Sequence, residues 1–129
     1  MREIKFRGKR KGNGEWVYGF YIRIDNDNGV IKNLSETKHF IKQLNTAMYE
    51  VISETVGQYT GLKDKNDKEI FEDDIIKDEY GNYLIVKWNE IFGCWEFSGV
   101  KLSDYGNPDF WLKKIKVIGN IHDNSELLK

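Results

Sequence analysis

Apolar and charged residues alternate on both sides of a glycine-containing turn at the start of the chain. Ile4 and Phe6 are interleaved with lysine and arginine residues, and Gly12 and Gly14 then interrupt the pattern. Strand side chains alternate between two faces, and glycine supplies the positive φ angles of tight turns. The pattern therefore predicts a β-hairpin with one basic, solvated face. Its second strand carries an apolar residue at every second position: Trp16, Tyr18, Phe20, Ile22 and Ile24.

The second half of the chain contains short apolar segments separated by polar or glycine-bearing turns. Strands are expected at 75–76, 83–88, 94–97 and 115–121. Their spacing is typical of a small SH3-like β-barrel, an analogy at the level of fold only. The segment from Leu102 to Asp109 predicts a surface loop, and the residues after Asn124 predict a closing helical turn.

The middle of the chain has weaker patterns. Residues 25–29, Asp-Asn-Asp-Asn-Gly, predict a turn, and Val30 and Ile31 predict a short strand. Ser35 is a suitable N-cap for a helix in which five apolar residues recur at helical spacing, namely Phe40, Ile41, Leu44, Ala47 and Met48.

These elements predict an α+β fold that is mainly antiparallel β. An N-terminal hairpin region would pack with the C-terminal barrel, beside one or two short helices. The 129 residues suit a single domain, 1–129, with sub-regions 1–54 and 55–129. The charged start lacks the apolar segment of a signal peptide, and no run of about 18 apolar residues occurs. Cys94 is the single cysteine, so no internal disulfide can form, and a cytoplasmic protein is expected. Cys94 itself is expected in the core.

Charge is segregated along a chain whose formal net charge is −1. Seven basic and two acidic residues occur up to Arg23, whereas eight acidic and three basic residues occur from Asp64 to Glu79. Such segregation indicates either a basic binding face or two surfaces that complement each other within the fold or between copies.

The segment from Gly57 to Ile76, GQYTGLKDKNDKEIFEDDII, is too particular in order and spacing for a generic turn. With MREIKFRGKRKGNGEWVYGF at the start and VIGNIHDNSELL near the end, it resembles the YopX-like proteins of phages and prophages of Gram-positive bacteria. The likeness covers most of the chain except its middle third. It implies a small, soluble accessory protein of the host cytoplasm without an established activity. The signature residues are Gly57, Gln58, Tyr59, Thr60, Gly61, Leu62, Asp64 and Asp74.

The resemblance also implies glycine where this chain has Asp67 and Asp73. Asparagine and aspartate adopt left-handed backbone geometry more readily than most other residues, so Asn66, Asp67 and Asp73 are candidates for positive φ. If Asp67 and Asp73 have positive φ, changing either to glycine is expected to raise stability by about 0.5 to 1 kcal/mol.

The catalytic and metal-binding patterns in the sequence are incomplete. Asp64 and Asn66 begin like a calcium loop, but the later ligand positions of an EF-hand are missing, which favours a structural turn. The acidic cluster from Glu72 to Asp74 lacks the later residues of a nuclease motif. His39 is interpreted as a boundary residue. We therefore expect no catalytic residue, metal, cofactor or enzymatic activity.

Two functions of different classes stay open. The first is a non-enzymatic module that binds a host or phage protein, or that binds itself. In the latter case its homo-oligomer is expected to persist across salt concentrations. The second is a nucleic-acid-binding module whose affinity falls with salt. Tryptophans 16, 88 and 95 are expected in the core, and Trp111 on the surface. Neither function would involve a membrane. The candidate contact residues are Lys5, Arg7, Lys9, Arg10, Lys11 and Trp111, with Arg23 as a further candidate.

Overall fold

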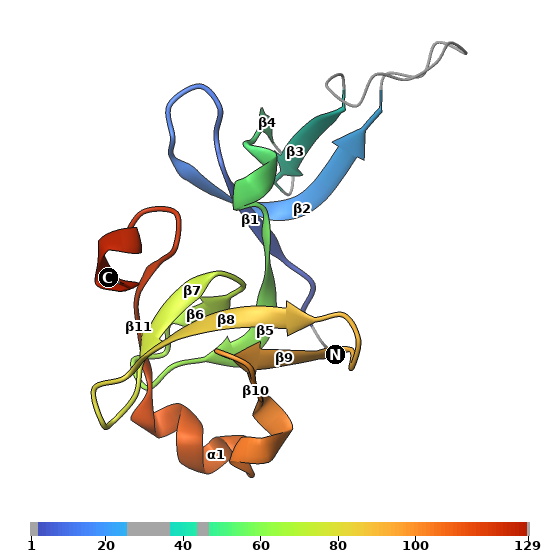
Figure 1. Cartoon of the computed structure of the whole chain (residues 1–129). Helices are drawn as coiled ribbons and strands as arrows, with labels where there is room; N and C mark the ends of the chain where they lie inside the picture. Colours follow the sequence, from blue (N-terminus) through green and yellow to red (C-terminus); the bar gives the residue numbers. More distant parts are fainter. Residues whose placement is uncertain (1–2, 26–36, 44–46, 129) are drawn as a thin grey trace. The chain divides into compact units, whose positions relative to one another are not determined.

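The computed structural model describes residues 3–25, 37–43 and 47–128 (Figure 1). The chain divides into two compact units, unit 1 from Met1 to Gln58 and unit 2 from Tyr59 to Lys129. This division lies close to the boundary between 54 and 55 that the sequence suggested. Among the described helices, none is both long enough and apolar enough to cross a membrane.

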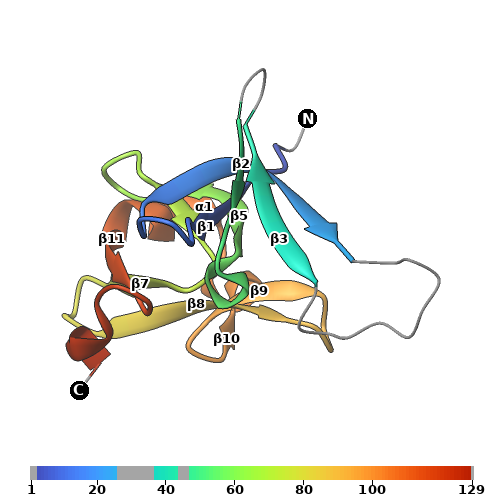
Figure 2. The ribbon, with the colours of Figure 1, turned by 90° about the horizontal axis from the view of Figure 1, so that it is seen from above.

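Unit 1 is an antiparallel sheet. Its strands lie in the order β4, β3, β2, β1 and β5, and Figure 2 shows β2 beside β3. A short 3-10 helix, Ser53–Thr55, precedes β5. The strands are β1 (Phe6–Lys9), β2 (Trp16–Ile24), β3 (Lys38–Lys42), β4 (Met48–Glu50) and β5 (Gly57–Lys63), the last of which continues into unit 2.

The predicted N-terminal hairpin is confirmed. β1 pairs with β2, and the backbone N–H of Arg10 donates to the carbonyl of Glu15 at 2.9 Å to close the turn. The N–H of Gly14 donates to the Arg10 carbonyl at 2.9 Å, and Gly14 has a φ of 73°. The turn therefore needs a residue that tolerates positive φ, as the sequence indicated.

The core of unit 1 lies on one face of the sheet. The alternating apolar residues of β2, from Trp16 to Ile24, lie on the opposite face. Val17, Ile41 and Val51 are buried in the core. Gly19 lies on the core face, where an added Cβ would be 2.3 Å from the Lys42 carbonyl oxygen, so β2 and β3 require glycine here. The partly buried residues that pack against this core are Phe6, Tyr21, Tyr49 and Val56.

The helix predicted around residues 40–48 is wrong. Phe40 and Ile41 belong to β3, and Met48 begins β4. Short apolar runs fit helical and strand periods equally well, and pairing with the long strand β2 decides between them here. Ser35 and Leu44, like the predicted turn beyond Asp25 and the strand at 30–31, lie outside the described residues.

Unit 2 contains an antiparallel sheet in the order β10, β9, β8, β7 and β11. The strands predicted for the second half are thus confirmed. The described strands end at β10 and β11 without closing, so the SH3-like barrel stays a prediction. The strands are β6 (Glu69–Phe71), which pairs with β5, β7 (Asp74–Lys77), β8 (Tyr83–Asn89), β9 (Cys94–Phe97), β10 (Val100–Lys101) and β11 (Lys116–Asn120).

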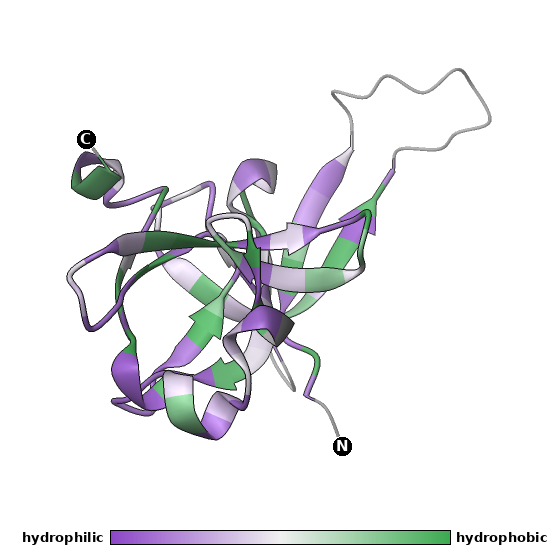
Figure 3. Ribbon diagram, turned by 60° about the horizontal axis from the view of Figure 1, so that its bottom comes forward, coloured by the Kyte–Doolittle hydropathy of each residue, from purple (hydrophilic) through white to green (hydrophobic). Residues whose placement is uncertain are grey.

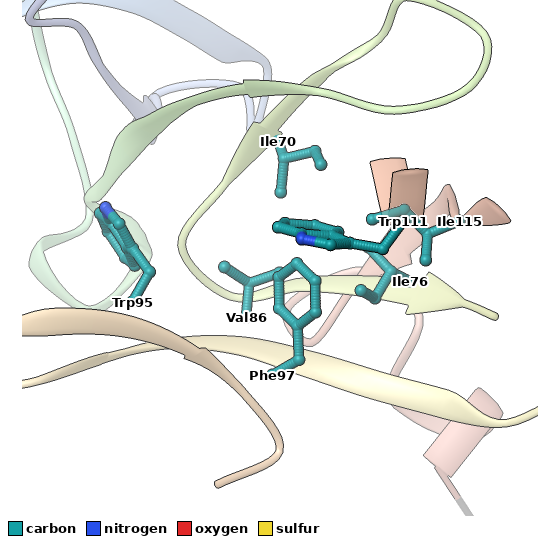
Figure 4. Close-up of a cluster of buried hydrophobic side chains, with 7 residues drawn as sticks. All are labelled: Ile70, Ile76, Val86, Trp95, Phe97, Trp111 and Ile115. Carbon is teal, nitrogen blue, oxygen red and sulfur yellow. The ribbon is translucent and has the colours of Figure 1, made fainter. Parts of the chain in front are cut away.

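The core of unit 2 is rich in aromatic and branched side chains (Figure 4). Trp111 is 8% exposed, so the expectation that it lies on the surface is wrong. Its ring meets the Phe97 ring edge-on, with centroids 5.6 Å apart. Trp88 is instead 40% exposed, against the expected core position, and Cys94 is only partly buried. The buried cluster comprises Ile70, Ile76, Val86, Trp95, Phe97, Trp111 and Ile115.

Short helices replace the surface loop expected from Leu102 to Asp109. A 3-10 helix spans Leu102–Tyr105, the α-helix α1 spans Pro108–Trp111, and a 3-10 helix, Leu112–Lys114, follows. Asn107 caps α1 because its side chain accepts the N–H of Asp109 at 3.0 Å. The sole proline therefore begins a helix, where its missing N–H costs nothing. The predicted closing turn is a 3-10 helix, Ser125–Leu128.

Asp67 and Asp73 have the predicted positive φ angles, 65° and 71°, whereas Asn66 does not. The side chain of Asp67 is 85% exposed. Asp67→Gly is therefore expected to raise the free energy of unfolding by about 0.5 to 1 kcal/mol, through relief of left-handed strain. Urea denaturation with an unchanged m-value would measure the gain.

Lys68→Gly, next to that site in a backbone without positive φ, is the matched control and should be destabilising. A lower midpoint for Asp67→Gly would contradict the strain argument. Asp73 differs because its carboxylate contacts Lys87 Nζ at 2.5 Å and His122 Nε2 at 3.2 Å. The gain expected from Asp73→Gly is therefore offset by the loss of these contacts.

Candidate functional site

The β1–β2 register places the apolar residues of β2 on the face away from the core of unit 1. Trp16 pairs with Lys9, and Tyr18 pairs with Arg7. Residues directly opposite each other in an antiparallel pair share a face. The predicted basic face and the apolar alternation of β2 therefore coincide, and we call this side of the sheet the outer face.

The outer face continues across β3 and β4. Ile22 pairs with Phe40, Phe20 pairs with Lys42, and Lys42 pairs with Met48. Figure 3 shows hydrophobic and hydrophilic residues in turn along the strands. The apolar residues of the outer face are Trp16, Tyr18, Phe20, Ile22, Ile24, Phe40 and Met48.

Much of this apolar surface is in contact with solvent. Phe20 is 51% exposed, Met48 46%, and Tyr18 and Ile24 44% each. Single exposed apolar residues are normal on a protein surface, but several neighbours on one sheet face form a patch of the kind that binds a partner. The outer face is therefore the candidate functional site of unit 1.

Basic side chains on the outer face contact its aromatic and acidic residues. The guanidinium carbon of Arg7 lies 4.7 Å from the centroid of the Trp16 ring, and Lys9 Nζ lies 5.8 Å from it. Such cation–π contacts hold positive charge over the ring. Lys11 Nζ contacts a carboxylate oxygen of Glu50 at 3.1 Å. Arg7 is buried, so it does not belong to a solvated basic row.

The other two candidate basic residues of the hairpin also have local partners. The Arg10 guanidinium lies 4.2 Å from the Tyr49 ring centroid and 3.9 Å from Glu15. Lys5 Nζ lies 3.4 Å from Glu3. Unit 1 thus brings the five candidate basic residues onto one hairpin, although not onto one face, whereas Trp111 belongs to the core of unit 2.

The signature residues hold the turns and strands around β5. Gly57 and Gln58 pair with β1, and Tyr59 pairs with Phe71 of β6. The Thr60 hydroxyl donates to the Ile70 carbonyl at 2.8 Å, and Gly61 has a φ of 86°. Leu62 packs against the core of unit 2. We therefore assign a structural role to these residues.

Asp64 and Asp74 of the signature are hydrogen-bonded acceptors inside unit 2. Asp64 Oδ1 accepts the backbone N–H groups of Asn66 at 2.8 Å and Lys68 at 2.9 Å. Its Oδ2 accepts the N–H of Val117, at 2.8 Å. The buried Asp74 carboxylate accepts the N–H of Phe71 at 2.8 Å. The structural turn favoured over a calcium loop is therefore present.

Two histidine contacts occur away from the outer face. The Tyr21 hydroxyl lies 2.6 Å from Nδ1 of His39, and the two rings stack. His122 contacts Asp73, which also binds Lys87. Among the described residues, no group of three or more histidine, cysteine, aspartate or glutamate side chains could hold a metal ion.

The exposure of the outer face and the contributions of Phe40, Lys42 and Met48 were not predicted from the sequence. The outer face could have been predicted from the length of the hairpin turn. A turn between Lys9 and Trp16 sets these two residues opposite each other, on the same face. The other three residues were hidden because their segment was interpreted as a helix.

Comparisons with known proteins relate nearly the whole chain to one family and the chain to one known fold. A family model described as YopX protein matches residues 5–129. No curated protein matches the chain. The crystal structure of protein EF1440 from Enterococcus faecalis is similar, with 22% identity, complete coverage of both chains and a TM-score of 0.61. At this identity the likeness shows a shared fold.

Proposed function

The chain belongs to the YopX protein family, and from this premise we propose that it is a non-enzymatic protein-binding module that docks a partner through its outer face. The observation that supports the proposal is the row of exposed apolar side chains on that face, led by Tyr18, Phe20 and Met48. The proposed setting is an accessory role for a phage or prophage in the cytoplasm of the host cell.

The residue types of the outer face suit a protein interface. Aromatic residues and methionine are enriched at the centres of such interfaces, where they supply anchors with a large contact area. Trp16, Tyr18 and Phe20 follow one another along one strand, and Met48 reaches the same face from β4. A sheet face with these anchors favours a partner that presents an apolar helix or strand.

The charges of the outer face favour a partner other than a second copy. Lys9, Lys38 and Lys42 share this face with Glu50. A two-fold dimer would set the same basic surface against itself, which is unfavourable. The proposed partner therefore carries carboxylates beside its apolar residues.

The acidic segment from Asp64 to Glu79 would be a weaker electrostatic partner for the basic surface of a second copy than its composition suggests. Three of its carboxylates, those of Asp64, Asp73 and Asp74, are buried in unit 2. They accept hydrogen bonds there and present little charge to a second molecule. Homo-oligomer formation, expected from the sequence, is therefore the second outcome of the test.

The test begins with a photo-crosslinking amino acid at position 20, which captures the partner in host cells for identification by mass spectrometry. Calorimetry with the purified partner then compares the native chain with the double variant Tyr18→Ser and Phe20→Ser. Loss of two aromatic anchors is expected to weaken binding by at least about tenfold. Because the anchors are apolar, the affinity should fall far less steeply between about 50 and 200 mM salt than the affinity of a phosphate-backbone contact.

The matched control carries Tyr80→Ser and Phe110→Ser, which remove one tyrosine and one phenylalanine from exposed positions of unit 2. This control should bind with native affinity. Equal weakening by both double variants would contradict the proposal. A dimer that sedimentation detects, and that only the outer-face variant dissociates, would show instead that a second copy is the occupant. Binding that nuclease treatment abolishes would favour nucleic acid.

A further inference from the structure

Five lysines line a solvent-open depression of about 400 Å³ in unit 2. They come from three segments that are distant in sequence: the turn after β5, the end of β7, and the 3-10 helix before β11 together with the start of β11. We call this depression the lysine basin. Its lining residues are Lys65, Lys77, Asp78, Glu79, Lys113, Lys114 and Lys116.

Backbone pairing holds these segments together. Lys77 and Lys116 are directly opposite each other where β7 pairs with β11. The N–H of Lys65 donates to the carbonyl of Ile115 at 3.1 Å, which ties the turn to the same edge. Lys113 and Lys114 precede this point in the 3-10 helix. The clustering is therefore a property of the folded unit, not of one basic stretch of sequence.

The basin concentrates like charge at a cost in stability. Lysines directly opposite each other on neighbouring strands repel, and Lys77 and Lys116 form such a pair. The two carboxylates of the lining have protein partners: Glu79 lies 3.7 Å from Lys114 Nζ, and Asp78 accepts the N–H groups of Tyr80 and Asn82. Positive charge therefore exceeds negative charge in the basin.

The residues that line the basin favour one of two classes of polyanionic macromolecule, nucleic acids and acidic proteins. Protein interfaces are depleted in lysine and depend on apolar anchors, and the residues that line the basin include no apolar side chain. Lysine side chains act as mobile point charges that suit phosphate oxygens, whatever the base sequence. A phosphodiester backbone therefore fits the basin better than an acidic protein surface.

We propose that the lysine basin is a sequence-independent contact site for the phosphate backbone of nucleic acid. This site is separate from the hairpin residues that the sequence suggested, and it does not depend on the outer face. Phosphates replace the missing counter-charge of the Lys77–Lys116 pair, so binding relieves a repulsion already present in the free protein. The affinity is then steeply dependent on salt, since each phosphate contact releases counterions.

The test is fluorescence anisotropy of a labelled mixed-sequence DNA duplex at several salt concentrations. The basin variant carries Lys113→Gln, Lys114→Gln and Lys116→Gln, and the matched control carries Lys5→Gln, Lys9→Gln and Lys11→Gln, with the same change in net charge. We expect the basin variant to lose at least about tenfold in affinity at 50 mM salt and to flatten the salt slope by about two to three units. The control should stay within about twofold of the native chain.

Thermal unfolding separates a binding role from a structural one. Because the basin variant removes repulsion, its Tm should be equal to or above the native Tm while binding is lost. If it fails to fold, the pair Lys65→Gln and Lys77→Gln tests the same prediction from the other segments. The proposal is overturned if the native chain does not bind the duplex at 50 mM salt, if the hairpin control loses as much affinity, or if poly-glutamate competes as well as DNA.

Discussion

Replacing Trp111 by alanine should lower the free energy of unfolding of unit 2 by about 3 to 5 kcal/mol. The side chain is buried against Phe97 and Tyr105, with ring centroids 5.6 and 5.7 Å away. Its indole N–H also donates to the Gly106 carbonyl at 3.3 Å. Alanine would leave a large cavity between α1 and the sheet and an acceptor without its donor. Urea denaturation followed by far-UV circular dichroism measures this loss.

Trp88→Ala is the matched control for that experiment. Trp88 is 40% exposed and packs edge-on against Trp95 at 5.0 Å, so its removal should cost no more than about 1.5 kcal/mol. Similar losses for the two variants would contradict the assignment of Trp111 to the core. A negligible loss for Trp111→Ala would indicate instead that Trp111 lies on the surface, as its sequence context suggested.

Replacing Asp64 by alanine should be comparably severe, at about 3 to 5 kcal/mol. One carboxylate accepts three backbone N–H groups, from Asn66, Lys68 and Val117. The third of these lies 53 positions along the chain, so the residue fastens the turn after β5 to β11. These three hydrogen bonds are partly buried, and a buried amide that loses its acceptor costs about 1 to 3 kcal/mol.

Asp64→Asn should lower the free energy of unfolding less than Asp64→Ala does. The amide oxygen of asparagine still accepts a hydrogen bond, whereas its NH₂ group faces at least one backbone N–H donor that is left without an acceptor. Asp67→Ala, in the same turn, should have a small effect since its side chain is 85% exposed. Amide hydrogen exchange of Val117 would identify the mechanism, with faster exchange in Asp64→Ala than in Asp67→Ala. Equal stability of the two alanine variants would refute the role given to Asp64.

Local chemistry made much of the fold predictable. The hairpin turn required glycine at position 14, and the positive φ of Asp67 and Asp73 followed from the glycines that the resemblance implies there. The strands of unit 2 were recognisable because apolar runs such as that from Tyr83 to Trp88 are bounded by polar, glycine-containing turns. These are effects within a few residues, which a sequence displays directly.

Errors occurred where partners distant in sequence decide the outcome. Phe40 and Ile41 fit a helical pattern, yet pairing with β2 makes them a strand. Trp111 follows a polar loop, yet packing against Phe97 buries it. The lysine basin was equally hidden, because Lys77 and Lys116 become neighbours only through the pairing of β7 with β11. The charge pattern of the hairpin also could not show that Arg7 lies over Trp16.

The position of β5 has a consequence for the evolution of the chain. Boundaries between compact units usually fall in exposed linkers, where recombination can join one unit to unrelated neighbours. Here the boundary between Gln58 and Tyr59 falls within a strand whose first residues pair with β1 and whose later residues pair with β6. A recombination breakpoint at this place would divide a hydrogen-bonded strand. The two units are therefore expected to be inherited together, as one module that gene shuffling seldom separates.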